Sequence, residues 1–535
     1  MTETIKQTLR DSAAARWTAL ILMSFAMLFA YMFLDILAPL QKLLEAAPHL
    51  QWSKDIYGTV SGSGYILNVM GFLILAGIIL DKIGVRNSTL VAGSLMLVGA
   101  SIKFYGVSDA FNNGGFGYEL FNSFWLALPA SAKMSLLGFA IFGCGVEMAG
   151  ITVVKAVVKW FKGKELALAM GLQVAIARLG VSTVFILVPR FAETGGIPGA
   201  IGFGAVLLLI GFLSFGAYFM MDKKLDAQSG EIQEKDDPFR IKDIGKIFTS
   251  SGFWLVALLC VLYYSAIFPF QKYAVNMLDC NLTFAELPEE SFWKTPKATV
   301  ISYLIMLSVA ITSFTSNFSK KKMKLSLLTC SALLLVAYCF ICYQKQTASA
   351  IFSVFPLLAV GITPILGNYI DKKGKAASML MLGSLLLVAC HLTFAFLLPK
   401  FQGQETAGII LAFATILVLG TSFSLVPASL WPSVPKLIDS NVLGSAYALI
   451  FWVQNIGLFL FPILIGKILV ASNTAIIEQV DLGVLTPEQA SVMYDYTNPL
   501  IMLACLGIAA LVLGFVLKAT DKKKGYGLEL PNKKN

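Results

Sequence analysis

Two charged side chains stand alone in long apolar stretches of this sequence, Glu147 in GVEMAG and Arg178 in AIARLG. A charge at membrane depth costs about 2.5–3.5 kcal/mol on insertion scales, so such a residue is expected to serve a purpose. A guanidinium can bind a carboxylate and a carboxylate can bind an ammonium, so together they could hold both ends of a zwitterion. The alternative is an ion pair that fastens two helices, and one pair could do both by neutralising itself when the site is empty.

The two charges are equally far from the turn WFKGKE, which separates their helices. Glu147 lies 13 residues before Trp160, and Arg178 lies 13 residues after Glu165. At about 1.5 Å of rise per helical residue, both side chains stand about 20 Å from the turn. Two neighbouring antiparallel helices would therefore bring the acid and the base to the same depth, near the membrane midplane.

Further polar and aromatic residues within apolar segments are candidates for the same site. Asp35 lies in the outer half of the first helix, where it could equally reach toward the surface. Lys272 follows Pro269, which interrupts the hydrogen-bond ladder of the seventh helix. Adjacent amides in an apolar helix need a neighbouring helix or a ligand as partner, whereas most membrane aromatics only pack or face lipid. The candidates for the opposite wall are Tyr263, Tyr264, Phe268, Phe270, Trp431, Tyr447, Trp452, Gln454 and Asn455.

The sequence predicts no enzyme and no cofactor. It has no histidine–carboxylate metal spacing, no phosphate-binding loop and no nucleotide-binding fingerprint. The 8 cysteines lie almost all in apolar segments, so their spacing predicts neither disulfides nor a metal cluster. His391 is expected to be a packed residue without a chemical role. A gradient across the membrane must therefore supply the energy for any work that this protein does.

The composition places these residues in a lipid bilayer. The chain is 57% hydrophobic and 13% charged, with a mean hydropathy of +0.76, which a soluble globular protein does not have. Its net charge of +10 comes from short clusters between apolar runs, so it indicates membrane topology and not nucleic-acid binding. The polar N-terminus runs directly into a long apolar helix, unlike a signal peptide, so this helix is expected to be retained.

The apolar windows predict an all-α polytopic membrane protein. About fourteen windows reach the roughly 20 residues that a bilayer requires, and the basic clusters lie on the side of both termini, which is therefore expected to be cytoplasmic. We predict an N-terminal six-helix bundle at 1–221, a cytoplasmic linker at 222–250, a C-terminal bundle at 251–520 and a cytoplasmic tail at 521–535. The second bundle has two helices too many, which best fit an inserted hairpin at about 299–343.

A short basic turn follows the second helix of each half. The first turn contains Gly77, Asp81, Lys82, Gly84 and Arg86, and the weaker second turn contains Gly367, Asp371 and Gly374. The first pattern, G-x-x-x-D-K-x-G-x-R, resembles the loop signature of the major facilitator superfamily, although a plain basic turn is the alternative. The resemblance implies two six-helix bundles, glycines that permit close helix approach, and an aspartate that pairs at a gating interface.

Several widely separated segments carry a more specific resemblance. They are GVEMAG, WFKGKELALAMGLQVAIARLG, YYSAIFPFQKY, LGNYIDKKGK, SLVPASLWPSVP and LGSAYALIFWVQNIGL. Together they resemble the lysosomal dipeptide-transporter branch of that superfamily across about two thirds of the chain, but not across the 299–343 hairpin. The resemblance implies a dipeptide substrate, an acid at Asp35, uniport-like movement and an accessory membrane protein.

We therefore predict a monomeric dipeptide transporter that works by alternating access. Arg178 would bind the peptide carboxylate, and Glu147 or Asp35 would bind the ammonium. A buried acid could also carry a proton, so proton coupling is the alternative to uniport. The rival functions are a carrier for another organic anion, a peptidoglycan fragment or a drug, and a peptide-binding sensor or scaffold without transport. A bacterial cytoplasmic membrane is the expected location, and a lysosomal membrane is the alternative.

Overall fold

The computed structural model describes residues 8–50, 52–161, 164–229, 241–317, 319–438 and 442–531, and every regular element in these ranges is a helix. Twelve described helical segments are long and apolar enough to cross a membrane. In lipid, a helix satisfies all its backbone hydrogen bonds internally, which explains why unbroken apolar runs adopt it. The predicted all-α membrane fold is confirmed.

Two of these segments each hold two membrane crossings. Lys54–Val107 has 54 residues and Leu168–Gln228 has 61, whereas about 20 helical residues cross a bilayer. The helical path breaks in the first at Gly84, with φ of 76°, and in the second at Gly196, with φ of 62°. Glycine adopts such positive φ values without steric cost. The twelve segments therefore provide about fourteen crossings, as the sequence predicts.

The N-terminal bundle consists of α1 (Ala13–Leu34), α3 (Lys54–Ser63), α4 (Leu73–Val107), α7 (Ala130–Phe161) and α8 (Leu166–Ser229), with short helices α2 (Gln41–Ala46), α5 (Asp109–Asn112) and α6 (Tyr118–Ser123). In this bundle α4 packs along α7, and α1 packs along α8. The α4–α7 contact is close because a Cβ added to Gly99 would lie 2.3 Å from the Phe142 nitrogen. Small residues of this kind let membrane helices approach through their backbones.

The C-terminal bundle consists of α10 (Ser251–Asn281), α11 (Pro296–Ser316), α12 (Lys321–Gln344), α13 (Ala348–Phe352), α14 (Val354–Lys373), α15 (Ala376–Leu392), α16 (Glu405–Leu437), α17 (Leu443–Ser472) and α20 (Thr497–Lys524), with short helices α18 (Thr474–Asp481) and α19 (Pro487–Ala490). Here α15 packs against α16 and α20, and α14 packs against α16. His391 is fully buried in α15, and its Nδ1 lies 3.0 Å from the Leu387 carbonyl oxygen, which suits a packed residue.

The connection between the bundles begins later than the predicted residue 222. Helix α8 continues to Ser229, and its Asp222 is buried within the N-terminal bundle. The rest of the connection includes α9 (Ile241–Phe248), while residues 230–240 lie outside the described residues. Of the predicted tail, α20 covers the beginning up to Lys524, and residues 532–535 are not described.

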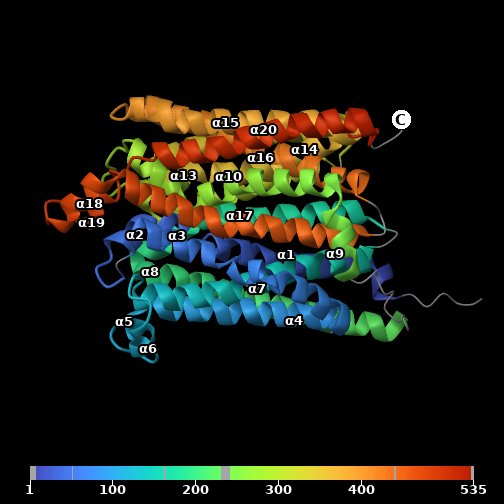
Figure 1. Cartoon of the computed structure of the whole chain (residues 1–535), viewed down its shortest axis with the longest axis horizontal. Helices are drawn as coiled ribbons and strands as arrows, with labels where there is room; N and C mark the ends of the chain where they lie inside the picture. Colours follow the sequence, from blue (N-terminus) through green and yellow to red (C-terminus); the bar gives the residue numbers. More distant parts are fainter. Residues whose placement is uncertain are drawn as a thin grey trace, which may run out of the picture.

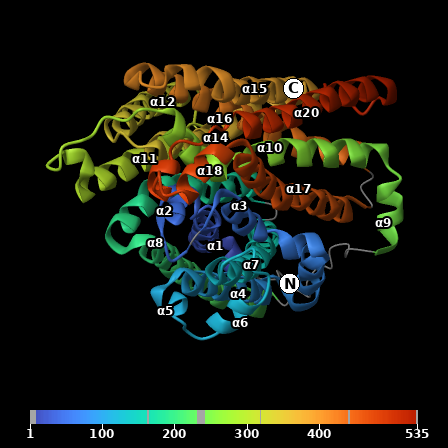
Figure 2. The same cartoon turned by 60° about the vertical axis from the view of Figure 1, so that its left-hand side comes forward.

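The predicted hairpin corresponds to α11 and α12, which lie beside both bundles. Helix α11 contacts α14 of the C-terminal bundle and α8 of the N-terminal bundle. Figure 2 shows α11 on the side of the hairpin that is nearer to α8. Helix α12 is fastened to the C-terminal bundle by the Tyr338 hydroxyl, which lies 2.7 Å from the Ser353 hydroxyl. The hairpin therefore covers one edge of the seam between the bundles.

The two ends of the molecule differ in the elements that they carry (Figure 1). One end carries α9 and the chain's C-terminus, and we call it the linker end. The other carries α2, α5, α6, α18 and α19, and we call it the loop end. The long helices run between these ends, so a side chain near the middle of such a helix lies near the middle of the molecule.

Candidate functional site

Arg178 projects from the N-terminal bundle onto an aromatic ring of the C-terminal bundle. Its guanidinium carbon lies 4.4 Å from the centroid of Phe423, on α16. A guanidinium is attracted to the face of such a ring, and its five N–H donors suit a carboxylate. The Arg178 Nε is buried and has no hydrogen-bond partner among the described residues, which leaves this donor for a ligand.

The ring of Phe423 belongs to a cluster that we call the aromatic wall, which consists of Tyr264, Phe268, Phe423, Trp431, Tyr447 and Phe451. The rings of Tyr264 and Phe268 stack with centroids 5.5 Å apart. The Trp431 indole N–H donates to the Tyr264 hydroxyl over 3.1 Å, and the Tyr447 hydroxyl donates to the Trp431 carbonyl over 3.3 Å. These hydrogen bonds fix the positions of the Tyr264, Trp431 and Tyr447 rings.

Glu147 is half-buried on α7, and no ion pair joins it to Arg178 in the described structure. The expected neutralising pair is therefore not formed in this conformation. The helix packing agrees with this, because α7 packs mainly along α4 and α8 packs mainly along α1, while α7 and α8 share a smaller contact. Tyr31 of α1 lies within electrostatic range of both charges. The acid and the base thus stand apart, each available to a different ligand group.

Other predicted wall residues make contacts inside the C-terminal bundle. The Tyr263 hydroxyl lies 2.6 Å from the Ser422 hydroxyl, and the Gln454 amide oxygen accepts from the Cys260 thiol over 3.2 Å. The Asn455 amide donates to the Phe451 carbonyl, while its buried Oδ1 has no hydrogen-bond partner among the described residues. Asn455 therefore keeps an acceptor, whereas Tyr263 and Gln454 are engaged in helix packing.

Trp452 and Phe270 were also predicted to line the site, but neither is part of the aromatic wall. The Trp452 indole donates to the Val69 carbonyl over 2.8 Å, which joins the two bundles. Phe270 packs against His391 with ring centroids 5.2 Å apart. Tyr31, Phe423 and Phe451 lie at the site without having been predicted from the sequence. The chain contains 39 phenylalanines and 17 tyrosines, so residue type alone does not single out these three.

Asp35 and Lys272 pair with each other across the two bundles. Asp35 lies just past the end of α1, and its carboxylate is 2.9 Å from the Lys272 ammonium on α10. The Gln271 amide also donates to Asp35, over 2.6 Å. Both charged side chains are buried, so each satisfies the other in a place that water does not reach. In this conformation the Asp35 carboxylate is bound by Lys272 and Gln271 and is not available to a ligand.

This pair belongs to a set of contacts at the loop end that we call the loop-end gate, which consists of Asp35, Lys54, Tyr57, Lys272, Tyr273 and Asn276. The Lys54 ammonium donates to the Asn276 amide oxygen over 2.6 Å. The Tyr57 hydroxyl donates to the Lys272 carbonyl over 2.6 Å, and the Tyr273 hydroxyl donates to the Lys54 carbonyl over 3.2 Å. Buried hydrogen bonds from both sides therefore hold the bundles together at this end.

At the linker end, Asp81 and Arg86 of the first basic turn form ion pairs within the N-terminal bundle. Asp81 lies 2.7 Å from Lys155, and Arg86 lies 3.3 Å from Asp226. Gly84 and Gly374 have positive φ values, as their turns require. A Cβ added to Gly77 would meet nothing within 4 Å, so the close helix approach expected there is not present in this structure.

The turn between α7 and α8 is held by charges from the start of the chain, although Lys162 and Gly163 within it are not described. Glu165 accepts from Arg16 over 3.0 Å, and Lys164 donates to Asp11 over 2.9 Å. A hydrogen bond from its own backbone and the Arg16 guanidinium hold the pKa of Glu165 below its usual value. These contacts fix the linker-end termini of the helices that carry Glu147 and Arg178.

Comparison with known proteins identifies the fold. A profile of the Major Facilitator Superfamily matches residues 23–351, which is more than half of the chain. The chain belongs to the major facilitator superfamily. It is therefore a multi-pass membrane protein with the fold of a transporter, and the resemblance seen in the basic turns is confirmed.

Relatives within the superfamily point to one branch. The lysosomal dipeptide transporter MFSD1 of Bos taurus is 26% identical over 472 residues, which cover 85% of this chain and 80% of that protein. The proteins of the same name from Homo sapiens and Danio rerio are 24% and 26% identical over 476 residues, with the same coverage. The chain is therefore similar to this branch, as the resemblance of its separate segments implies.

Solved structures support the fold alone. The nucleoside transporter NupG superposes with a TM-score of 0.58 at 12% identity and covers 94% of this chain and 99% of its own. A structure on substrate recognition in proton dependent oligopeptide transporters superposes with a TM-score of 0.56 at 11% identity, with the same coverage. Both show that this major facilitator chain has the general architecture of its superfamily.

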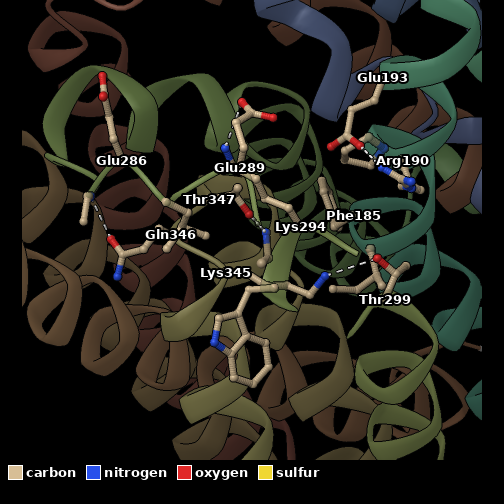
Figure 3. A pocket seen from close by; sticks show the side chains of 16 residues that line it. Phe185, Arg190, Glu193, Glu286, Glu289, Lys294, Thr299, Lys345, Gln346 and Thr347 are labelled. Carbon is tan, nitrogen blue, oxygen red and sulfur yellow. Dashed lines mark hydrogen bonds and ion pairs between the residues drawn. The ribbon is translucent and has the colours of Figure 1, made fainter. Parts of the chain in front are cut away.

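This major facilitator protein also has a cleft at the loop end that was not predicted from the sequence (Figure 3). The cleft has a volume of about 980 Å³ and lies between α8, the segment 282–295 and the ends of the hairpin. Its charged lining residues are Arg190, Glu193, Glu286, Glu289, Lys294 and Lys345. The Lys345 ammonium donates to the Thr299 hydroxyl over 3.4 Å, and burial lowers the pKa of Lys345. Arg190 and Glu193 lie on α8, whereas Glu286, Glu289 and Lys294 lie in the polar segment 282–295, where charge alone gives no signal of a site.

We expect Gly62→Ala to hold the loop end of this major facilitator protein open. A Cβ at Gly62 of α3 would lie 2.5 Å from the Phe459 carbonyl oxygen of α17. This oxygen belongs to the backbone, so it cannot move aside as the end of a flexible side chain can. Such a clash costs about 1–3 kcal/mol, which shifts the closed population by about tenfold or more. Spin labels at Glu119→Cys and Glu478→Cys, both exposed at the loop end, should then report longer distances.

The matched control for Gly62→Ala is Gly216→Ala. A Cβ at Gly216 of α8 would meet nothing within 4 Å, so this variant should keep the distance distribution of the parent. A distribution that is unchanged in Gly62→Ala would contradict the assignment of the α3–α17 contact to a closed gate.

Proposed function

We propose that this protein is a dipeptide carrier that works by alternating access. The observation that carries the proposal is that Arg178 of the N-terminal bundle lies on the Phe423 ring of the aromatic wall, while Tyr31 lies within electrostatic range of both Arg178 and Glu147. The MFSD1 relatives, which are named as dipeptide transporters, support the same substrate. In this proposal, the chain performs no covalent chemistry and the two bundles rock around the bound peptide.

Each end of the peptide has one assigned partner. Arg178 binds the free carboxylate, for which it exchanges the weaker contact with the Phe423 ring for charge-assisted hydrogen bonds. Glu147 binds the free ammonium, because Asp35 is already paired with Lys272. Tyr31 lies within range of both charges and can contact the peptide unit between them. The side chains of the peptide would lie along the aromatic wall.

This division of roles predicts the selectivity. All dipeptides share the two termini that Arg178 and Glu147 hold, so the carrier should accept many side chains and require both termini to be free. The aromatic wall contributes apolar contact and does not require particular polar groups on the peptide, which also favours a broad range of peptide side chains.

We infer that the linker end faces the cytoplasm. The basic clusters around Lys82, Lys322 and Lys373 and those of the C-terminal segment lie in the connections that the sequence assigns to this side, as the positive-inside rule requires. In this orientation the loop-end gate closes the outer side. The proposed location is the cytoplasmic membrane of a bacterium, and fractionation of the source cells tests it against an internal membrane.

The test of substrate class uses the purified full chain and alanylalanine. We expect free alanylalanine to raise the melting temperature and to accumulate in proteoliposomes, whereas its amidated and its acetylated forms should do neither. The reason is that each modified form lacks one of the charges that Arg178 or Glu147 binds. Stabilisation by the amidated form alone would instead indicate a carrier for cations, and binding without accumulation would indicate a sensor.

The same proteoliposomes decide the coupling. Uptake of labelled alanylalanine is measured with and without an imposed pH gradient. We propose uniport, so the two conditions should reach the same internal concentration. Accumulation above the external concentration only with the gradient would overturn uniport in favour of proton coupling.

A further inference from the structure

Lys103 is a fully buried lysine to which the proposed transport cycle has so far given no role. It lies in the outer part of α4, and its ammonium has no hydrogen-bond partner among the described residues. The ammonium lies 3.5 Å from the centroid of Phe139 and 5.5 Å from that of Phe33. A ring face offsets only part of the cost of removing an ammonium from water. A neutral side chain would serve packing better, so this charge calls for an explanation.

The ring of Phe139 connects Lys103 to the loop-end gate. The Lys272 ammonium lies 5.9 Å from the centroid of the same ring, so the separation of the two ammonium groups cannot exceed the sum of the two distances. Lys272 is in turn 2.9 Å from the carboxylate of Asp35. Two lysines and one carboxylate therefore share one buried region, and this carboxylate is held by Lys272.

The three charges are divided unequally between the bundles. Asp35 and Lys103 belong to the N-terminal bundle, whereas Lys272 belongs to the C-terminal bundle. When the loop end opens, Lys272 must move away with its bundle, and Asp35 loses its ion pair. To the extent that Asp35 stays covered by the N-terminal bundle, a carboxylate without a counter-ion opposes this opening.

We propose that Lys103 is the substitute counter-ion of Asp35 in the state in which the loop-end gate is open. With the gate closed, Asp35 pairs with Lys272, and Lys103 rests on the rings of Phe139 and Phe33. With the gate open, Lys272 enters water and the flexible Lys103 side chain turns to Asp35. The N-terminal bundle then carries a neutral pair, so neither state leaves the carboxylate unpaired.

Lys103 acts through Asp35 and is a positioning residue that need not touch the transported molecule. The inference rests on alternating access between two bundles and not on a dipeptide substrate. Its test therefore measures opening of the gate without any substrate, and it can succeed or fail independently of the substrate assignment.

The test measures how often the gate opens in the full chain, held in lipid nanodiscs so that reagents reach both faces. The 8 native cysteines are replaced, and Ser61→Cys is introduced as a probe. Ser61 is buried in α3 and lines the small space beside Asp35 and Lys272, so a maleimide reaches it only after the bundles part. The labelling rate of this probe then reports the population of the open gate.

We expect Lys103→Met to slow this labelling by about tenfold or more, because the open state loses its counter-ion. Lys103→Arg should restore the rate, since it retains a mobile cation. The matched control is Lys133→Met, which removes another buried lysine at the loop end, one that donates to the Trp125 carbonyl over 3.4 Å. It should leave the rate unchanged.

A second background separates the proposed role from a structural one. In Asp35→Asn there is no carboxylate to satisfy, so adding Lys103→Met should not slow labelling further. Equal slowing in both backgrounds would mean that Lys103 only supports packing, and it would overturn the proposal. An unchanged or faster rate in Lys103→Met alone would overturn it as well. If Lys103→Met fails to fold, Lys103→Gln replaces it with the same expected results.

Discussion

Replacing Arg178 by alanine is expected to abolish dipeptide transport while leaving the protein folded. The guanidinium is the group to which we assign the peptide carboxylate, and hydrogen bonds to charged groups contribute about 1.5–3 kcal/mol each. Loss of two such bonds predicts a fall in transport of about 100-fold or more. Initial rates of labelled alanylalanine uptake in proteoliposomes measure it.

The chain offers a closely matched control for this variant. Arg190 lies on the same helix, but it pairs with Glu193 in the loop-end cleft, away from the aromatic wall. Arg190→Ala should therefore retain most of the uptake. Arg178→Lys should remain strongly impaired, because an ammonium is a point charge and lacks the planar fork of a guanidinium.

Glu147→Gln tests the other end of the peptide. It should lower uptake as Arg178→Ala does, because an amide gives a neutral partner to the ammonium in place of a charged one. Glu193→Gln is its control. If both Arg178→Ala and Glu147→Gln transport alanylalanine at the parent rate, the site lies elsewhere.

The second large effect is expected at the ion pair between Asp35 and Lys272. Breaking a buried pair by removing one partner costs about 3–5 kcal/mol, because the other charge stays buried without compensation. Asp35→Asn and Lys272→Met should each destabilise the closed loop end and lower uptake by about tenfold or more. Uptake and spin-label distances across the loop end measure both consequences.

Exchanging the two charges provides the decisive comparison. The double variant Asp35→Lys with Lys272→Asp should recover part of the stability and of the uptake that either exchange alone removes. Lys42 and Glu488 form the control pair, since they also join the bundles at the loop end but are exposed and 3.9 Å apart. Lys42→Gln should have an effect below about 1 kcal/mol. Loss of both properties in the double variant, to the level of the single ones, would contradict a gate held by this pair.

These predictions differ in how far the sequence alone supports them. Glu147 and Arg178 could be singled out because a charge in an apolar run is visible without any structure, and equal spacing from one turn indicated equal depth. Their expected ion pair was wrong for this conformation, since chain neighbours need not pack side by side. Helix α7 lies along α4 and α8 lies along α1, which no local pattern indicates.

The gate and the aromatic wall depended on contacts between distant segments. Asp35 and Lys272 are separated by more than two hundred residues, and each could be justified separately as a substrate ligand. Phe423 became part of the site because Arg178 of the other bundle lies on its ring. The cleft at the loop end was not predicted either, because it combines charges of α8 with charges of the distant segment 282–295.

The sequence by itself determined the membrane location, the number of crossings, the hairpin and the superfamily, because each of these is encoded locally in hydrophobic length, charge and short motifs. The tertiary structure decided which charges pair, which aromatic rings face Arg178 and which end of the molecule is closed. The physical reason is that membrane helices are uniformly apolar along their length. A few polar contacts and close glycine approaches therefore select their neighbours, and these become visible only when the helices are packed.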